Sequence, residues 1–234
     1  MKRIDKLISE HTHYSRNEIK KLIARGAVFA NDERVKKPED KYDENSVSIK
    51  INGNEIDTRE HVYLLLNKPK GYVSATEDAL QSTVLDLVPQ KYKSRNLFPA
   101  GRLDKDTTGL MLITDDGEFA HNILSPKKHV KKEYEVTLDI PVTDEMVTGF
   151  KAGIQLKDGE CKSALLEATG EYTGIVTIIE GRYHQIKRMF GCFGAKVIEL
   201  NRICMGGLYL PKDIAPGEIR EATPAELEKI QSRN

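Results

Sequence analysis

The chain has 234 residues, 39% of them hydrophobic, which suits one large domain or a small domain joined to a medium one. Thirty-six basic residues balance 36 acidic ones, so net charge alone neither indicates nor excludes an anionic partner. The three cysteines are widely spaced, without a Cys-x-x-Cys pair or a Cys/His cluster, which argues against a disulfide framework and a structural zinc site.

The first fifty residues have the pattern of a small helix-helix-β unit with a basic surface. Apolar residues at helical spacing predict a helix over residues 3–10. Ser15 and Glu18 form a capping box that starts a second helix, and Gly26 is placed to end it. Short strands are expected around 28–30 and 47–51, before an Asn52-Gly53 hairpin turn. Residues 1–37 hold ten Lys/Arg against five Asp/Glu, and the outer face of the second helix carries Arg16, Lys20 and Lys21, with Arg25 nearby.

From residue 62 onward the pattern alternates between strands and helices. Strands are predicted at 62–66, 110–114, 134–140, 164–168, 175–179 and 197–200. Helices are predicted at 117–124, 143–150 and 184–192, with a last one starting at Thr223. Such an order, with hairpin-like neighbours, predicts an α+β fold with a largely antiparallel sheet.

One polar loop between apolar segments could carry chemistry. It reads Gly101-Arg-Leu-Asp-Lys-Asp-Thr-Thr-Gly-Leu110 and holds Asp104 and Asp106 interleaved with Arg102 and Lys105. A carboxylate held beside cations can act as a nucleophile or a base. A loop of this composition is more often plain charged surface, so these residues alone do not decide.

The loop resembles the catalytic loop of pseudouridine synthases, in which Arg-Leu-Asp is followed shortly by Thr/Ser-Gly. The glycine before the arginine is typical of the RsuA-like branch. Four further segments match the family in the expected order: 66–71, 131–136, 180–189 and 200–208. Residues 2–50 resemble the S4 RNA-binding domain. The resemblance therefore covers nearly the whole chain.

The resemblance implies an S4 domain with a linker over residues 1–58. It implies a catalytic domain over 59–234, built on a mixed, largely antiparallel sheet with flanking helices. Asp104 falls at the nucleophile position, and Lys187 falls where many relatives have the active-site arginine. Whether the carboxylate attacks ribose or the uracil ring stays open.

Other positions implied by the resemblance concern the uridine pocket. Tyr134 is either a stacking platform for the base or the group that removes its proton, and a plain core tyrosine is the alternative. Leu200 is expected at the edge of the pocket. Arg102 either fills the gap left by a flipped uridine or makes a phosphate contact or salt bridge. Asp106 is expected to support the loop. His184 is expected to hold the loop by hydrogen bonds, and a general acid is the alternative role.

A set of basic residues is assigned to RNA binding: Arg3, Arg16, Lys20, Lys21, Arg25, Lys68, Lys131, Arg182 and Arg188. The run from Lys127 to Lys132 is either a phosphate contact or solvated surface.

The expected activity is that of an isomerase that converts uridine to pseudouridine in ribosomal RNA. The resemblance is greatest to enzymes of 16S rRNA and implies uridine 516. A 23S rRNA enzyme of the same family and a non-catalytic RNA-binding assembly factor are the alternatives. No phosphate-binding loop, dinucleotide fingerprint or metal-ligand cluster is present, so no cofactor is expected.

The charged N-terminus is unlike a signal peptide, and no apolar run approaches the ~20 residues that span a bilayer. A cytoplasmic monomer without a membrane role is therefore expected. Its partner is expected to be a small-subunit assembly intermediate.

Overall fold

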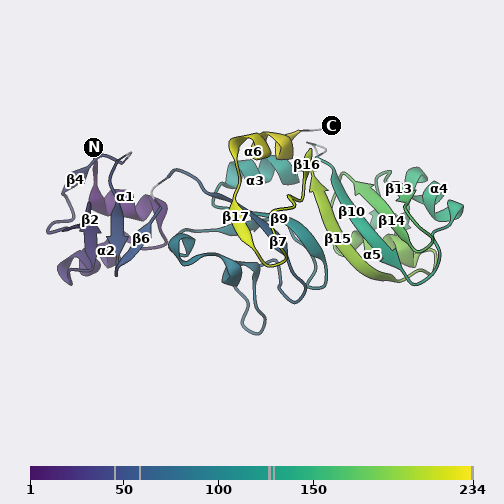
Figure 1. The fold of residues 1–234 in the computed structure, drawn as a ribbon, viewed down its shortest axis with the longest axis horizontal. Helices are drawn as coiled ribbons and strands as arrows, with labels where there is room; N and C mark the ends of the chain where they lie inside the picture. Colours follow the sequence, from purple (N-terminus) through teal and green to yellow (C-terminus); the bar gives the residue numbers. More distant parts are fainter. Residues whose placement is uncertain (45, 58, 126–127, 129, 233–234) are drawn as a thin grey trace. The chain divides into compact units, whose positions relative to one another are not determined.

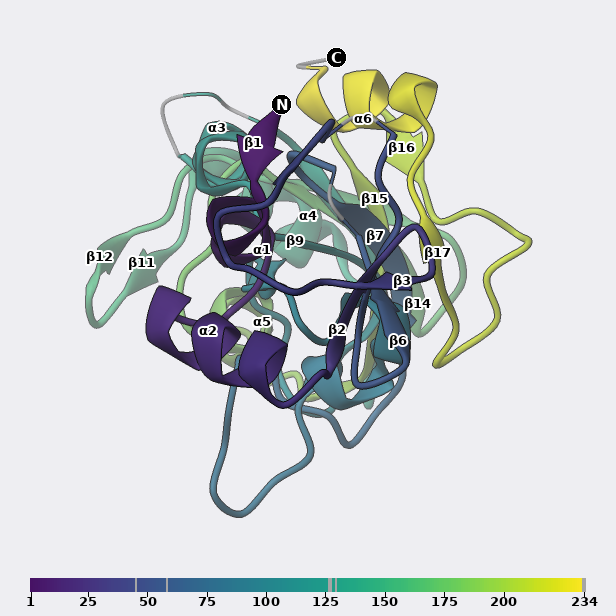
Figure 2. The ribbon, with the colours of Figure 1, turned by 90° about the vertical axis from the view of Figure 1, so that its left-hand side faces the viewer.

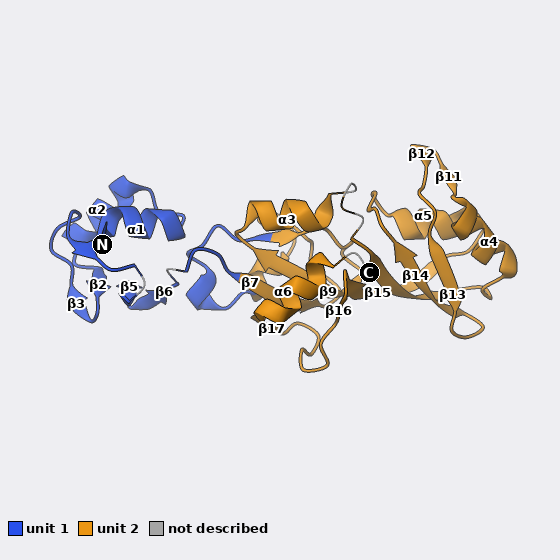
Figure 3. Cartoon of the chain, turned by 90° about the horizontal axis from the view of Figure 1, so that it is seen from above, with its two compact units in different colours: residues 1–62, 88–98 blue, residues 63–87, 99–234 orange. Residues whose placement is uncertain are grey.

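The computed structural model describes residues 1–44, 46–57, 59–125, 128 and 130–232. The chain divides into two compact units (Figure 3). Unit 1 comprises Met1–Val62 and Val88–Phe98, and unit 2 comprises Tyr63–Leu87 and Pro99–Asn234. The segment 88–98, predicted from the sequence as part of the C-terminal domain, thus groups with unit 1.

Unit 1 packs two helices against a small antiparallel sheet (Figures 1 and 2). The helices are α1 (Ile4–His11) and α2 (Arg16–Ala24). The sheet has the order β3-β2-β5-β6, with bounds β2 (Val28–Ala30), β3 (Glu33–Arg34), β5 (Ile49–Ile51) and β6 (Asn54–Ile56). A separate pair joins β1 (Lys2–Arg3) to β4 (Lys41–Tyr42).

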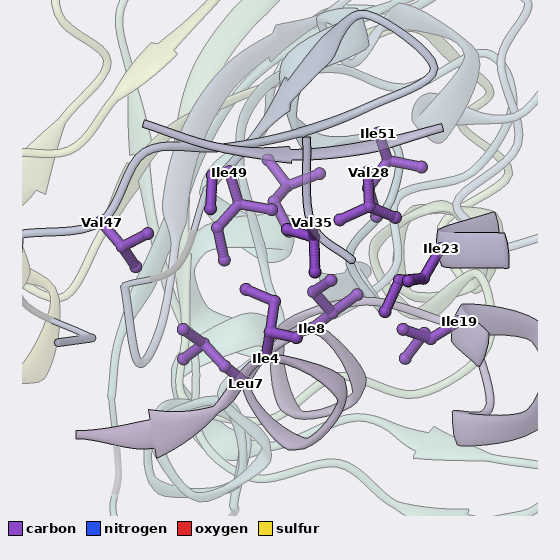
Figure 4. Packing of buried hydrophobic residues seen from close by; sticks show 12 residues of the cluster. Ile4, Leu7, Ile8, Ile19, Ile23, Val28, Val35, Val47, Ile49 and Ile51 are labelled. Atoms are coloured by element: carbon purple, nitrogen blue, oxygen red, sulfur yellow. The ribbon is translucent and has the colours of Figure 1, made fainter. Parts of the chain in front are cut away.

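The local signals read from the sequence account for unit 1. The capping box is present, because the Ser15 hydroxyl accepts from the Glu18 amide while the Glu18 carboxylate accepts from the Ser15 amide. The β5–β6 turn places Asn52 at φ 52° and Gly53 at φ 81°, both in the left-handed region that a tight hairpin turn needs. Aliphatic side chains from both helices and the sheet interdigitate in one core (Figure 4).

The segment 88–98 is tied into unit 1 by a buried arginine. Arg95 donates to the backbone carbonyls of Asp57, Arg59 and Glu60 at 2.7, 2.8 and 2.9 Å. A buried guanidinium needs such acceptors, since losing them would leave a desolvated charge. The contact holds η2 (Gln90–Tyr92) and its flanks beside β6.

Unit 2 is built on one sheet with the strand order β13-β14-β10-β15-β9-β7-β17. Along this order of described strands, the β15–β9 pair is parallel and the other pairs are antiparallel, as is the β15–β16 pair. The predicted α+β class with a mixed, largely antiparallel sheet is confirmed. The strand bounds are β7 (Tyr63–Lys68), β9 (Thr108–Thr114), β10 (Lys132–Leu138), β13 (Leu165–Ala168), β14 (Thr173–Ile178), β15 (Val197–Met205) and β17 (Ile219–Glu221); β8 (Phe98–Ala100) pairs with β9, and β16 (Leu208–Tyr209) with β15.

Helices pack on both ends of this sheet. Their bounds are η1 (Val84–Leu87), α3 (Gly117–Leu124), α4 (Asp144–Ala152), α5 (Gln185–Gly191) and α6 (Pro224–Gln231). The Asp116 carboxylate caps α3 and also accepts from the Tyr63 hydroxyl at 2.6 Å, which ties this helix to β7. The Phe150 and Phe190 rings, 4.6 Å apart, join α4 to α5. Helix α5 is thereby fixed at the sheet, with its first turn directed toward the loop before β9.

Candidate active site

A buried lysine holds the polar loop 101–107 through hydrogen bonds to its backbone. Lys68, the last residue of β7, has 0% exposure, and its ammonium donates to the backbone carbonyls of Asp104 at 3.0 Å and Thr107 at 2.8 Å. A second brace is the Ser74 hydroxyl, which donates to the Leu103 carbonyl at 2.7 Å and accepts from its amide at 2.9 Å. The loop that carries Asp104 is therefore tied by hydrogen bonds to the end of β7 and to Ser74.

The burial of Lys68 corrects its assignment as an RNA contact. A side chain with no exposed surface cannot touch a phosphate, and its donors are already used by backbone carbonyls. Burial lowers the pKa of Lys68 to about 8, although the charges of Asp106 and Asp104 oppose that shift. The role of this lysine is structural.

One lysine of α5 joins the two carboxylates of the loop. Lys187 Nζ lies 3.0 Å from Asp104 Oδ2 and 2.5 Å from Asp106 Oδ1. Asp104 and Lys187 are half-buried, whereas Asp106 is 70% exposed at its side chain. The sequence had set Asp106 aside as loop support, yet it shares the cation with the predicted nucleophile.

The charges of this cluster reinforce one another. Burial works against the Lys187 ammonium, but hydrogen bonds to Asp106 and Asp104 outweigh it and raise the pKa of Lys187. The same hydrogen bond from Lys187 lowers the pKa of Asp106, against a smaller opposing effect of burial. The cluster is thus a stable arrangement of one ammonium between two carboxylates.

His184, which is expected from the sequence to hold the loop, approaches the carboxylate of Asp104. Its Nε2 lies 3.5 Å from Asp104 Oδ1, whereas Lys187 Nζ lies 3.0 Å from the other carboxylate oxygen, Oδ2. The residue precedes α5 with φ 47° and ψ 35°, a left-handed conformation that is uncommon for a residue with a side chain. The only sequence signal was its place in the His-Gln-Ile-Lys motif.

Strand register brings Tyr134 and Leu200 toward the same region of the sheet. Tyr134 on β10 lies opposite Arg202 on β15, which lies opposite Gly109 at the start of β9. Since the side-chain period along a strand is two, Leu200 shares the face of Arg202 and Tyr134. Both predicted pocket residues are buried, at 8% and 6% exposure. One row of paired residues across the sheet thus connects Tyr134 to β9, the strand that follows the polar loop 101–107.

Gly109 is required where this row crosses from β15 to β9. It has φ 102°, and a Cβ there would collide with the backbone of Arg202.

Arg102, near the start of the loop, is exposed and has no hydrogen bond or ion pair with any residue that the structure describes. Its guanidinium is available to a ligand.

The predicted RNA-binding residues of unit 1 lie at its surface. The α2 set, comprising Arg16, Lys20, Lys21 and Arg25, is exposed. Arg3 is also exposed but pairs with the buried Asp5 carboxylate at 2.9 Å. The side chains of the α2 set are therefore more available to a ligand than that of Arg3.

The predicted RNA-binding arginines of unit 2 are engaged by a hairpin. Arg182 donates to the Gly159 carbonyl at 2.9 Å and to the Glu160 carbonyl, and Arg188 pairs with Asp158. These acceptors belong to the hairpin of β11 (Gln155–Leu156) and β12 (Gly159–Glu160).

The basic run before β10 is only partly available to a ligand. Lys131 pairs with Glu133 at 2.9 Å, and Lys132 is buried, so Lys132 cannot be a phosphate contact. Lys127 and His129 of this run lie outside the described residues.

Among the described residues, no group of three or more His, Cys, Asp or Glu side chains could hold a metal ion. No described helix is long and apolar enough to cross a bilayer.

Comparison with known proteins gives matches over both units. Residues 62–191 match the family described as RNA pseudouridylate synthase, and residues 2–48 match the S4 domain. An RNA pseudouridine synthase of Bacillus subtilis is 41% identical over 230 residues, covering 96% of each chain. Ribosomal small subunit pseudouridine synthase A of Escherichia coli is 46% identical over 170 residues, covering 72% of this chain and 73% of that one. A solved pseudouridylate synthase structure aligns with a TM-score of 0.70 at 38% identity, covering 98% of this chain and 100% of the other.

Proposed function

This chain belongs to the RNA pseudouridylate synthase family, and from that premise we propose that it converts one uridine of 16S rRNA, uridine 516, into pseudouridine with Asp104 as its nucleophile. As an RNA pseudouridine synthase it is an isomerase, because the product has the atoms of the substrate. The observation that carries the assignment of Asp104 is its half-buried carboxylate 3.0 Å from the Lys187 ammonium.

The reaction breaks the C1′–N1 glycosidic bond, turns the uracil and forms a C1′–C5 bond. The proton on C5 is lost and N1 takes up a proton, so atoms and electrons balance. Asp104 supplies the nucleophilic carboxylate, and Lys187 keeps a positive charge beside it through the reaction. Lys68 supports the position of Asp104 by donating to the Asp104 and Thr107 carbonyls within the same loop.

The uracil needs a surface that holds it while it is detached. We assign this role to the Tyr134 ring, with Leu200 at the edge of the pocket; their buried positions in one sheet region support the assignment. Proton removal at C5 is the second role assigned to Tyr134. Arg102 is assigned to the gap that the flipped uridine leaves, supported by its exposed guanidinium.

RNA binding is assigned mainly to unit 1. The exposed basic face of α2 can contact phosphates without sequence preference, which positions the RNA but does no chemistry. The functional division is proposed at residues 58 and 59. The proposed working form is a cytoplasmic monomer that acts on a small-subunit assembly intermediate.

Mapping of pseudouridines by mass spectrometry tests the proposal. Ribosomal RNA from cells with and without this gene should differ at one position, uridine 516 of 16S rRNA. Loss of a 23S rRNA position instead would assign the chain to the large subunit. An unchanged map would leave a non-catalytic RNA-binding protein and would contradict the proposal. Parallel reactions on protein-free 16S RNA and on assembly intermediates identify the substrate form.

A further inference from the structure

An aromatic pair lies directly beside the proposed nucleophile. The Tyr183 and His184 rings are stacked, with centroids 3.8 Å apart and planes 20° apart. His184 Nε2 is 3.5 Å from Asp104 Oδ1, while Lys187 Nζ is 3.0 Å from Oδ2. The carboxylate is therefore bracketed by one nitrogen on each oxygen, and one of those nitrogens belongs to a ring in the stack.

Tyr183 is the outer member of this pair. It is 70% exposed, whereas the His184 side chain is 38% exposed. A large aromatic ring with one face on a neighbour and most of its surface in water can take a second flat partner. Unpaired RNA bases are recognised by stacking on such rings.

The backbone supports a dedicated geometry at this point. His184 is held in the left-handed region immediately before α5, and its carbonyl accepts the Arg188 amide at 3.0 Å as the helix begins. Left-handed residues with a side chain cost energy and concentrate at sites where orientation matters. This conformation places the imidazole between Tyr183 and Asp104.

We propose that Tyr183 stacks on an unpaired base next to the target uridine, and that His184 is a positioning residue that passes this contact to Asp104. The inference rests on the proposed function, because it assumes that Asp104 reacts with RNA. A base on the outer face of Tyr183 restricts the motion of the Tyr183 and His184 rings. Because the imidazole is then held in place, the His184–Asp104 contact shortens from 3.5 Å to hydrogen-bond distance. Binding of the correct RNA thus fixes the orientation of the nucleophile.

Single-turnover pseudouridine formation by the full chain separates the two roles. Tyr183→Leu should raise the half-saturating RNA concentration by ~5- to 150-fold, the range for loss of one base–aromatic stack. Tyr183→Phe keeps the ring and should stay near wild type. Equal behaviour of the Leu and Phe changes would overturn the stacking role.

His184 is tested by the rate at saturating RNA. His184→Asn tolerates the left-handed backbone but is too short to reach Asp104, and it should slow the saturated rate about tenfold or more while leaving half-saturation within about twofold. His184→Gln, with a longer amide, should recover part of the rate. If His184→Asn fails to fold, His184→Gly, which accepts this φ without strain, takes its place. A saturated rate within twofold of wild type would refute the positioning role.

The coupling between the residues has its own measurement. Tyr183→Leu should slow the saturated rate in the wild-type chain but have no further effect on it when combined with His184→Asn. The same factor in both backgrounds would mean that Tyr183 does not act through His184.

A binding arm separates this inference from the proposed function. With the Asp104→Asn chain and RNA carrying 2-aminopurine beside the uridine, fluorescence should fall on binding and Tyr183→Leu should abolish the fall. This readout needs no turnover. If the fluorescence fall is intact while the wild-type chain forms no pseudouridine, only the proposed function is contradicted. No Tyr183-dependent fall would contradict the stacking site.

Discussion

The lysines of α2 and the lysines at the ends of β7 and β10 have opposite surroundings. Lys20 and Lys21 are exposed on a helix face, whereas Lys68 and Lys132 are buried and donate to backbone carbonyls. Burial lowers the pKa of both Lys68 and Lys132 to about 8. The comparison teaches that a count of basic residues cannot separate cations exposed at the surface from buried cations that donate to backbone carbonyls.

The largest expected effect lies in the chemistry of unit 2. Asp104→Asn is nearly isosteric and removes the carboxylate that we propose as the nucleophile, so no measurable pseudouridine should form. RNA affinity should change little, because it comes mainly from phosphate contacts elsewhere. Pseudouridine yield on 16S RNA and filter binding measure the two. Full activity of this variant would remove Asp104 from the mechanism.

Asp106→Asn is the matched control for that experiment. It makes the same chemical change two residues away but leaves the Lys187–Asp104 ion pair in place. A partial loss is expected, because Asp106 also binds the Lys187 ammonium at 2.5 Å. Equal and complete loss in both variants would leave the nucleophile unassigned.

Lys187→Met should have the next largest effect. The change keeps much of the stem but removes the charge beside Asp104, and loss of such an electrostatic partner costs ~10²–10³-fold in rate. Lys187→Arg should retain part of the activity, since the charge survives although the planar fork differs. Single-turnover rates at neutral pH measure this, and a Met variant as fast as wild type would contradict the charge-pair account.

Lys68→Met sharpens the comparison through stability. It leaves the buried carbonyls of Asp104 and Thr107 without their donor, so unfolding free energy should fall by about 2–4 kcal/mol. Urea denaturation measures the change. Lys20→Met, at an exposed lysine, is the control and should stay within about 0.5 kcal/mol of wild type.

The free energy of unfolding of wild type and of Lys68→Met should depend differently on pH. The pKa of Lys68 is about 8 in the folded chain, against an ordinary value of 10.5, so the unfolded chain binds more protons between these values. The contribution of Lys68 to stability should therefore rise as pH increases from about 8 to 10.5. The stability difference between wild type and Lys68→Met should grow over this window. A difference that shrinks would reverse the assigned direction.

The smallest expected effect concerns the α2 face. Changing Lys20 and Lys21 together to Gln should reduce the slope of log Kobs against log salt by roughly one to two, at ~0.9 per phosphate contact. The saturated rate should be unchanged. The exposed Lys212 of unit 2, also changed to Gln, is the control. An unaltered slope would take α2 out of the RNA interface.

This surface variant is a cleaner test of unit 1 than removal of residues 1–58. Such a truncation would strip Arg95 of its Asp57 acceptor and remove β6, which contacts η2 and its buried Tyr92. Misfolding and lost RNA binding would then be confounded. The grouping of segment 88–98 with unit 1 is the reason, and no local pattern in the sequence revealed it.

Features determined by short stretches were accessible from the sequence. The Ser15–Glu18 capping box is present, the hairpin turn at Asn52-Gly53 formed, and α3 has the predicted bounds Gly117–Leu124. These depend on hydrogen bonds and backbone preferences within a few residues. The motifs likewise singled out Asp104 and Lys187, whose side chains do lie together, although their catalytic roles stay predictions.

Only the tertiary structure decided which charges meet. Lys68 was predicted at an RNA surface and is buried beneath a loop 36 residues away, and Arg188 was predicted to bind RNA and pairs with Asp158 on a hairpin. The His184–Asp104 contact joins the residue just before α5 to the loop before β9. Composition and periodicity describe one segment at a time, whereas burial and ion pairing depend on which segments the sheet brings side by side.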